Sequence, residues 1–290
     1  MVPLQHLLSF TAEKRISILE TRNRNMALSD IEIAQKAKMK PIGEIAHKLG
    51  IPEEAMSAYG RYKAKISLAY LAGLADRPEE FDYSWSGLAR WMDDAVDALG
   101  LDRVHLVVHD IGGPIGFEWA IRNPDRVLSM TVLNTIVDVD GFRRPWPMAP
   151  FAVRGLGELW LRTTPRFLFS TMFYAQGIAK RALVPRSDVY AHLAFLRLHD
   201  RGRAFLKIMR GFELTAEKQR FLHEGLAERS YPVRLVWGER DPALGLEKME
   251  ACQRVFGLAD AILLPAKHFL QEDHAAEIGQ AVADLAAPLG

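Results

Sequence analysis

The chain has 290 residues, of which 49% are hydrophobic and 25% are charged, and its 37 Lys and Arg balance 36 Asp and Glu to a net charge of +1. This composition is typical of a soluble globular protein, gives no support for a nucleic-acid or membrane partner, and includes no run of the ~18 apolar residues that span a bilayer. The single cysteine, Cys252, excludes an internal disulfide and paired structural zinc motifs, and it favours a reducing, cytoplasmic setting.

The N-terminal quarter of the chain predicts short helices. Residues 1–25 are interpreted as an amphipathic extension without a secretory signal, so we expect no export. Residues 26–76 are predicted to be helical: one helix begins with a capping box at Ser29, a second follows Pro41, and a third opens at Pro52. These helices have few large apolar residues and would need another part to pack on.

Strands and helices alternate from Phe81 onward, which is the pattern of an α/β fold with a parallel sheet. Ser84 is predicted to cap a helix that ends at Gly100. Strands are predicted at residues 104–108, 127–134, 233–237 and 261–264, with helices at about 114–122 and 271–286. Residues from about 138 to 228 are predicted to be helical, because they are aromatic, broken by prolines and without strand-like runs.

A glycine-rich turn follows the first of these strands. A strand, a turn and a helix in succession present the turn residue at the carboxyl end of the sheet, where open α/β sheets bind ligands. That residue is Asp110. Gly112 and Gly113 are expected to remove side chains that would collide as the strand folds back, and the Ile111 N–H can stabilise an oxyanion. This is the arrangement of a nucleophile elbow, here with an Asp that would form an ester for water to cleave.

Two further side chains complete a predicted catalytic triad. Asp241 follows the strand at 233–237 and His268 follows the last strand, so both are expected at the carboxyl edge beside Asp110. The order nucleophile, acid, histidine is that of an α/β hydrolase. We predict that His268 activates the hydrolytic water and that Asp241 orients His268.

Simpler structural roles stay open for the same residues. Asp110 could cap a helix after a glycine turn, Asp241 could be a turn residue, and His268 could be a surface loop histidine. His109 is expected to be a packing or orienting neighbour, and Asn134 is expected to satisfy the end of a strand.

Several short motifs carry a resemblance to a known family. They are Asp76-Arg77-Pro78 and the residues at 81–84, 108–116, 132–134, 237–242 and 268–273. On these motifs, residues 77–290 resemble an α/β-hydrolase of the haloalkane dehalogenase and epoxide hydrolase group. The resemblance implies Asp110 as nucleophile, Asp241 as acid and His268 as base, a small apolar substrate, and no metal or other cofactor. It also implies a helical cap over about 138–228, with a pocket lined by Trp146, Trp160, Phe173 and Tyr174.

The subclass stays open between dehalogenase and epoxide hydrolase. Dehalogenases of this group usually have Trp after the nucleophile to hold the departing halide, whereas this chain has Ile111, which has no side-chain donor. Epoxide hydrolases use cap tyrosines as proton donors, for which Tyr174 and Tyr190 are candidates. Val108 is more typical of the dehalogenase branch.

The N-terminal part departs further from this family. In this family four strands come before the motif that corresponds to Asp76-Arg77-Pro78. The third of these strands ends in a His-Gly-rich loop that donates a second oxyanion N–H. Residues 26–78 instead resemble the extreme N-terminus of formate-tetrahydrofolate ligase, without that enzyme's glycine-rich ATP loop. The motifs that carry this second resemblance are at 29–35, 39–42, 48–52 and 59–66. We interpret the chain as a fusion of two fragments.

The predicted fold class is therefore α/β, an α/β-hydrolase core with a helical cap that lacks the first strands of the sheet and is preceded by short α-helices. The strand at 104–108 would be an edge strand, through which two copies could pair as a homodimer unless the N-terminal helices cover it. Losing one oxyanion donor typically costs ~10²- to 10³-fold in turnover. We expect an impaired hydrolase of this family; the alternatives are a fusion product without catalysis and a ligase-related protein without an ATP loop.

Overall fold

The computed structural model divides the chain into two units, Met1–Gly73 and Leu74–Gly290. It describes residues 40–58, 64–66, 81–197 and 200–287. The helix predicted to begin at Ser29 lies outside these ranges. Among the described residues, no helix has the length and apolar character that crossing a bilayer requires.

The described residues of the first unit include one helix of the predicted kind. Helix α3 (Ile42–Lys48) begins directly after Pro41, and the chain leaves it at Leu49. Proline suits this position because the N–H groups of the first helical turn have no partner within the helix.

The third predicted helix of this unit is wrong. Pro52 opens only the one-turn 3-10 helix η1 (Glu53–Ala55). The chain then becomes extended, and β1 (Met56–Ala58) pairs antiparallel with β2 (Ala64–Ile66). The backbone N–H and C=O groups of β1 therefore pair with those of β2 and not with the next turn of a helix, so this part of the chain is not helical as predicted.

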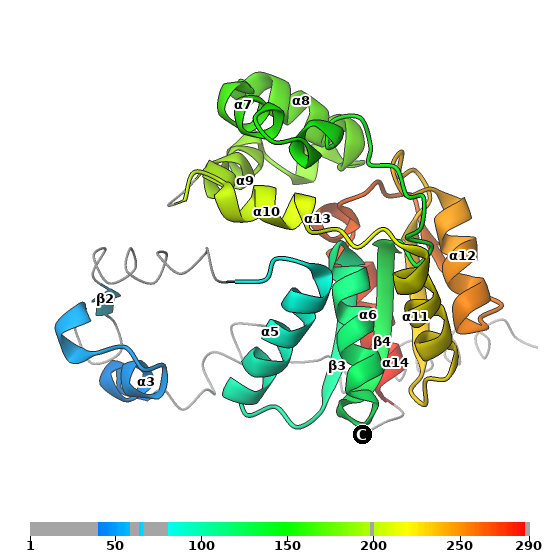
Figure 1. Ribbon diagram of the computed structural model, residues 1–290, viewed down its shortest axis with the longest axis horizontal. Coiled ribbons are helices and arrows are strands. Elements are labelled where there is room, and N and C mark those ends of the chain that lie inside the picture. Colours follow the sequence, from blue (N-terminus) through cyan, green and yellow to red (C-terminus); the bar gives the residue numbers. More distant parts are fainter. Residues whose placement is uncertain (1–39, 59–63, 67–80, 198–199, 288–290) are drawn as a thin grey trace, which may run out of the picture. The chain divides into compact units, whose positions relative to one another are not determined.

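A parallel sheet forms the middle layer of the second unit. Its strands are β3 (Val104–Asp110), β4 (Val127–Thr135), β5 (Val233–Gly238) and β6 (Ile262–Leu264), side by side in this order. All three neighbouring pairs are parallel, and Figure 1 labels β3 and β4 of this sheet. β4 is buried along nearly its whole length, as expected for a central strand covered on both faces. The predicted α/β class is confirmed.

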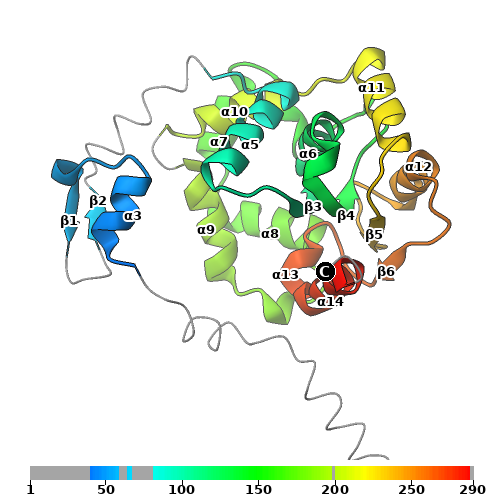
Figure 2. The same ribbon diagram turned by 90° about the horizontal axis from the view of Figure 1, so that it is seen from below.

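Helices cover both faces of this sheet (Figure 2). On one face lie α5 (Trp85–Ala98), α6 (Gly112–Arg122), α11 (Ala216–Ala227) and α12 (Leu246–Phe256); on the other lies α14 (Ala275–Ala286), against β4 and β5. The helix α5 begins where predicted because the Ser84 hydroxyl accepts a hydrogen bond from the Gly87 N–H at 3.0 Å. The predicted terminal helix is interrupted at His274, which separates α14 from the short α13 (Leu270–Asp273). The 3-10 turn η2 (Pro124–Arg126) leads into β4.

The cap is a separate group of helices beyond the carboxyl ends of the strands (Figure 1). It comprises η3 (Ala149–Ala152), α7 (Leu156–Thr163), α8 (Arg166–Gln176), η4 (Arg181–Leu183), α9 (Arg186–Arg197) and α10 (Arg203–Arg210). One apolar cluster joins Phe151 and Leu161 to Leu206 and Met209 of α10. The cap is predicted to extend to about residue 228, but it ends before α11, because α11 packs on α6 and α12 of the core.

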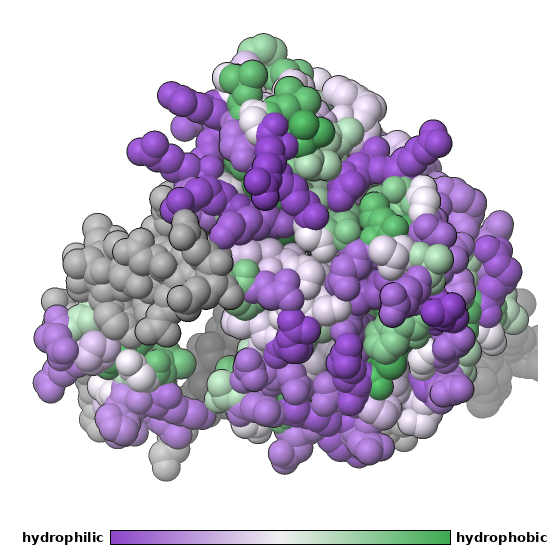
Figure 3. Space-filling model, in the orientation of Figure 1, coloured by the Kyte–Doolittle hydropathy of each residue, from purple (hydrophilic) through white to green (hydrophobic). Residues whose placement is uncertain are grey.

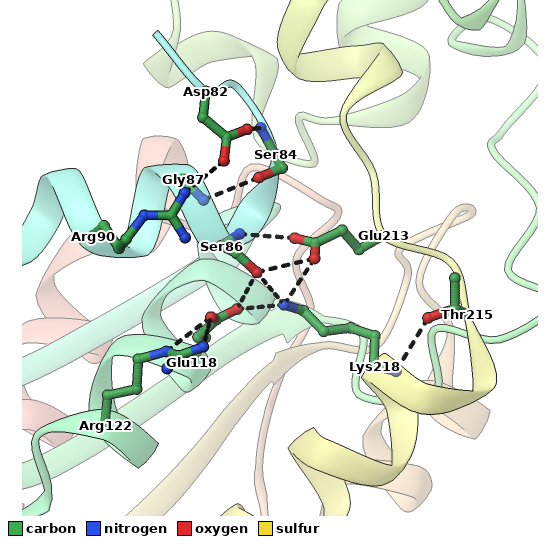
Figure 4. Close-up of polar contacts among 10 residues, drawn as sticks. All are labelled: Asp82, Ser84, Ser86, Gly87, Arg90, Glu118, Arg122, Glu213, Thr215 and Lys218. Carbon is green, nitrogen blue, oxygen red and sulfur yellow. Dashed lines mark hydrogen bonds and ion pairs between the residues drawn. The ribbon is translucent and has the colours of Figure 1, made fainter.

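A cluster of charges ties α6 to its neighbouring helices (Figure 4). The buried Lys218 of α11 donates from Nζ to Ser86 Oγ at 2.8 Å, to Glu213 Oε1 at 3.2 Å and to the Glu118 carboxylate. Glu118 on α6 is fully buried and also accepts from Arg122 at 2.7 Å. Each buried charge therefore has a partner of opposite sign, which a folded core requires.

Within the described residues, β3 is the edge strand of this sheet, with β4 as its neighbour. Successive side chains of β3 point to opposite faces. Val108, on the face that packs on α6, is 3% exposed, whereas Val107 is 45% exposed. The predicted edge position is confirmed; the pairing of two copies through this edge stays a prediction.

Candidate active site

Asp110 is the last residue of β3, directly before the turn at Ile111 that leads into α6. Its φ is 48°, in the left-handed region that non-glycine residues adopt rarely and Asp and Asn adopt more often than others. The Thr135 hydroxyl donates to the Asp110 carbonyl at 2.5 Å, and the β3–β4 pairing shifts register between Val108 and Asp110. Strained backbone of this kind clusters at functional sites and is the geometry of a nucleophile elbow.

Two glycines of α6 permit this turn by close packing. A Cβ on Gly113 would lie 1.8 Å from Thr135 Oγ1, and a Cβ on Gly116 would lie 2.5 Å from Val108 Cγ1. Gly112 has nothing within 4 Å of its Cβ position. The expectation that Gly112 prevents a collision is therefore wrong, because its Cβ would point into open space.

The three predicted triad residues meet at the carboxyl edge of the sheet. His268 Nδ1 lies 2.8 Å from Asp241 Oδ2, and His268 Nε2 lies 3.7 Å from Asp110 Oδ1. The Asp241 side chain is fully buried and the His268 side chain is 13% exposed, whereas the Asp110 side chain is 51% exposed. The histidine thus joins a buried carboxylate to an accessible one.

Buried polar contacts fix the position of Asp241. Its Oδ1 accepts from the N–H groups of Ala243 at 2.8 Å and Leu244 at 3.0 Å, and its Oδ2 accepts from Asn134 Nδ2 at 2.9 Å. Asn134 is itself held because its Oδ1 accepts from the Gly238 N–H at 2.7 Å. Asn134, expected only to satisfy a strand end, therefore also orients the carboxylate that bonds to His268.

The charges of the triad shift one another's pKa values. Burial acts to lower the pKa of His268, but hydrogen bonds and charge from Asp110 and Asp241 outweigh it and raise the pKa from 6.5 to about 10. Desolvation acts to raise the pKa of both carboxyls, but His268 outweighs it and holds each below its usual value. At neutral pH the site is therefore two carboxylates flanking an imidazolium.

The loop that carries His268 is attached to the end of cap helix α8. Lys267 Nζ donates to the carbonyls of Tyr174 at 3.1 Å and Ala175 at 2.7 Å, and the Phe269 N–H donates to Gly177 at 3.0 Å. A Cβ on Gly177 would lie 2.1 Å from the Phe269 ring, so only glycine fits there.

A second buried carboxylate strengthens this attachment. Asp273 Oδ2 accepts from the N–H groups of Ala179 at 2.8 Å and Lys180 at 2.7 Å, both in the segment that follows α8. On the other side, His109 Nε2 lies 2.8 Å from the His268 carbonyl, which agrees with an orienting role for His109. Asp273 and Lys267 were not singled out from the sequence, because their partners are about 90 residues away in the chain.

Of the four predicted pocket residues, Phe173 has a ring contact that leads to the triad. Its ring stacks on Phe269 at 4.6 Å, and the Phe269 ring lies 4.9 Å from His268. The buried Tyr174 donates its hydroxyl to the Val184 carbonyl at 2.7 Å, inside the cap.

The two predicted tryptophans have other surroundings. Trp160 packs on the cap cluster that contains Leu161, and Trp146 is 67% exposed. The backbone N–H of Ile111 helps to lower the pKa of the Asp110 carboxyl. Among the described residues, no three His, Cys, Asp or Glu side chains are grouped as a metal ion would require.

Known proteins resemble the two parts of the chain separately. A haloalkane dehalogenase of Mycolicibacterium smegmatis is 30% identical over 202 residues, which cover 64% of this chain and 63% of the dehalogenase. A formate–tetrahydrofolate ligase of Methylococcus capsulatus is 58% identical over 53 residues, which cover 18% of this chain and 10% of the ligase. The chain thus spans less than two thirds of either relative.

Solved structures share the fold of the second unit. The crystal structure of wild-type DBJA superimposes with a TM-score of 0.60 at 22% identity, covering 72% of this chain and 76% of that one. An epoxide hydrolase of Bacillus megaterium superimposes with a TM-score of 0.54 at 18% identity, covering 71% and 77%.

Family models match both parts as well. Residues 28–82 match the model of formate–tetrahydrofolate ligase, and residues 72–275 match that of the alpha/beta hydrolase fold. With this match over most of its length, the chain belongs to the alpha/beta hydrolase fold family.

Proposed function

We propose that this chain is a hydrolase in which Asp110 forms an ester with an apolar substrate that carries an electrophilic carbon, either an alkyl halide or an epoxide. One observation carries the proposal: the accessible carboxylate of Asp110, in a strained elbow, lies 3.7 Å from His268, which is bonded to the buried Asp241. The similarity to a haloalkane dehalogenase and the fold shared with an epoxide hydrolase support this substrate class.

In the first step an Asp110 oxygen attacks the carbon. A carbon–oxygen bond forms as the carbon–halogen bond breaks and releases halide, or as one carbon–oxygen bond of the epoxide breaks and its oxygen takes a proton from water. The low pKa of Asp110 keeps the nucleophile ionised for this attack.

In the second step water cleaves the ester. His268 flanked by two carboxylates holds its proton, with a pKa of about 10. Esterification removes the charge of Asp110, so the pKa of His268 falls and the ring releases its proton to solvent; the neutral ring can then accept a proton from water. Hydroxide then attacks the carboxyl carbon of the ester, the Ile111 N–H stabilises the oxyanion, and the alcohol leaves as the carboxylate re-forms.

The leaving group has weak support in this site, which is why both substrate classes must be tested. Ile111 has no side-chain donor for a halide. The Tyr174 hydroxyl is committed to the Val184 carbonyl and is not available to an epoxide oxygen. We therefore propose slow turnover. Having a single oxyanion donor would by itself lower the turnover rate ~10²- to 10³-fold.

We also infer that the chain joins two fragments and that its ligase-like segment adds no ligase activity. The similarity to the ligase covers 53 residues and 10% of that enzyme. ATP-dependent formyl transfer to tetrahydrofolate, measured with the full chain, should be absent. Transfer above the background without protein would contradict this inference.

Isotope labelling tests the hydrolase proposal. The full chain is incubated with haloalkanes and with epoxides in heavy-oxygen water. The mass of the peptide that carries Asp110 is then measured. Because water attacks the carboxyl carbon of the ester, repeated turnover should place heavy oxygen in the Asp110 carboxylate. Turnover with label only in the alcohol product would contradict an ester intermediate, and a folded chain without any turnover would favour the alternative of a fusion product without catalysis.

A further inference from the structure

The cap differs in charge from the rest of the chain. Residues 141–187, all of them described, contain eight Arg and Lys but one carboxylate, Glu158. The whole chain has 37 Lys and Arg against 36 Asp and Glu, so the remaining residues carry a net negative charge. The near-zero total therefore conceals a strongly basic segment.

Exposed apolar side chains lie in the same segment. Four of them are on α7, just before it and in the first turn of α8: Val153 (52% exposed), Leu156 (48%), Leu159 (57%) and Phe167 (69%). Figure 3 shows apolar side chains gathered over α7 and α8 at the top of the molecule, with hydrophilic side chains around them. We call these four residues, with the exposed Arg154, Arg162 and Arg166, the crown patch.

Packing inside the cap does not account for the crown patch. α7 buries Gly157 and Leu161 on its inner side, whereas Leu156 and Leu159, three residues apart, share the exposed side. A surface helix normally has a polar outer face, and adjacent exposed apolar residues mark an interaction surface. Glu158 is ion-paired with Arg210 at 2.8 Å, so it does not offset the arginines of the patch.

We propose that the crown patch docks the cap onto the surface of an anionic lipid bilayer. Interfacial binding combines Leu and Phe side chains at the boundary of the acyl chains with Arg and Lys near the headgroups, and this patch supplies both. A second copy of the chain is disfavoured because two basic surfaces would meet. Nucleic acid would use the arginines but would leave the aliphatic side chains in water. This inference does not rest on the proposed hydrolase activity, and it differs from the expectation from composition that no membrane is bound.

Vesicle sedimentation tests the proposal with the full chain. The probes are vesicles of phosphatidylcholine alone and vesicles that also contain phosphatidylglycerol. We expect co-sedimentation with the mixed vesicles only, and weaker binding as salt screens the arginines. A chain that stays in solution with both kinds of vesicle would overturn the proposal.

Two sets of substitutions separate the charged from the apolar contribution. The triple variant Arg154→Glu, Arg162→Glu and Arg166→Glu should bind the mixed vesicles at least about tenfold more weakly. The triple variant Leu156→Ser, Leu159→Ser and Phe167→Ser should also bind at least about tenfold more weakly, since apolar burial contributes to interfacial binding. Equal binding by parent and apolar variant would show attraction by charge alone and would overturn the docking mode.

Matched controls lie outside the cap. Leu99 (63% exposed) and Leu101 (44%) take the same Leu→Ser change, and the exposed Arg220 on α11 takes the Arg→Glu change. These variants should bind the mixed vesicles as the parent does. Thermal unfolding of every variant checks that it is folded. In a Phe167→Trp variant, the indole fluorescence that exceeds that of the parent, which has six tryptophans, should shift to shorter wavelength with mixed vesicles. If this difference signal is unshifted despite sedimentation, the chain binds through another surface.

Discussion

The carboxyl edge and the β3 edge of the sheet differ although they share one strand. At the carboxyl edge, Asp110, Asp241 and His268 come from three strand ends and meet within 3.7 Å or less. At the β3 edge, Val107 is 45% exposed and the described residues provide no outer strand. The geometry of the triad therefore draws on β3 to β6 and on the cap.

The hydrolase fold also takes its catalytic groups from two different parts of the chain. Asp110, Asp241 and His268, the proposed nucleophile, acid and base, all lie after residue 103 in the chain. In the fold family the second oxyanion donor comes from a loop that precedes these strands. The three triad residues lie together in this chain, and substitutions can test what their arrangement requires.

Replacing the nucleophile should have the largest effect on activity. Asn tolerates the left-handed conformation that Asp110 adopts at φ 48°, so Asp110→Asn should fold normally. It removes the attacking carboxylate, and we expect a loss of turnover on the order of 10⁴-fold or more. Product formation from a haloalkane or epoxide measures it; a variant with more than a tenth of the parent's rate would exclude Asp110 as nucleophile.

The turn behind the nucleophile should be sensitive at one glycine and tolerant at its neighbour. Gly113→Ala would bring a Cβ within 1.8 Å of Thr135 Oγ1 and should lower the free energy of unfolding by about 2–3 kcal/mol. Gly112→Ala has open space at the start of α6 and should be neutral or stabilising by up to about 1 kcal/mol. Urea unfolding measures both; equal effects would contradict the packing of this elbow.

The pKa of His268 should fall when either carboxylate is neutralised. Asp241→Asn removes one of the charges that raise it to about 10. Because the folded pKa exceeds the ordinary 6.5, this histidine stabilises the folded state fully below pH 6.5 and loses that contribution as the pH rises through about 10. Titration of the His268 ring signals by NMR, assigned with His268→Gln, measures the shift. An unchanged pKa in Asp241→Asn would show that the ion pair does not form.

The β3 edge should tolerate a charge that the core does not. Val107→Lys places an ammonium on a 45% exposed position and should change the free energy of unfolding by less than about 0.5 kcal/mol. Val108→Lys, at a 3% exposed position against α6, should unfold the chain. If copies pair through this edge, sedimentation should show a parent dimer that Val107→Lys converts to a monomer. A monomeric parent would remove the homodimer, and a strongly destabilised Val107→Lys would show that the edge is covered.

The strands, taken in chain order, and the residues at their carboxyl ends could be predicted from the sequence because each is marked by a local signal. Ser84 caps α5, the apolar runs form the strands, and Asp110 ends β3 just before a glycine-rich turn. Contacts between distant segments could not be predicted: the pairing of β1 with β2, the packing of α11 on α6, and the bonds of Asp273 to the end of α8. The surroundings of Tyr174 were missed for the same reason, since its partner Val184 belongs to the fold of the cap.

The central claim, that Asp110 becomes an ester which His268 then helps to cleave, can be tested by the intact mass of a His268→Ala variant. After incubation with a haloalkane or an epoxide, we predict a gain equal to the alkyl group or to the whole epoxide, located on the peptide that carries Asp110. The gain should be absent when Asp110→Asn is added. An unmodified His268→Ala variant, with a parent that turns over the same substrate, would contradict the claim.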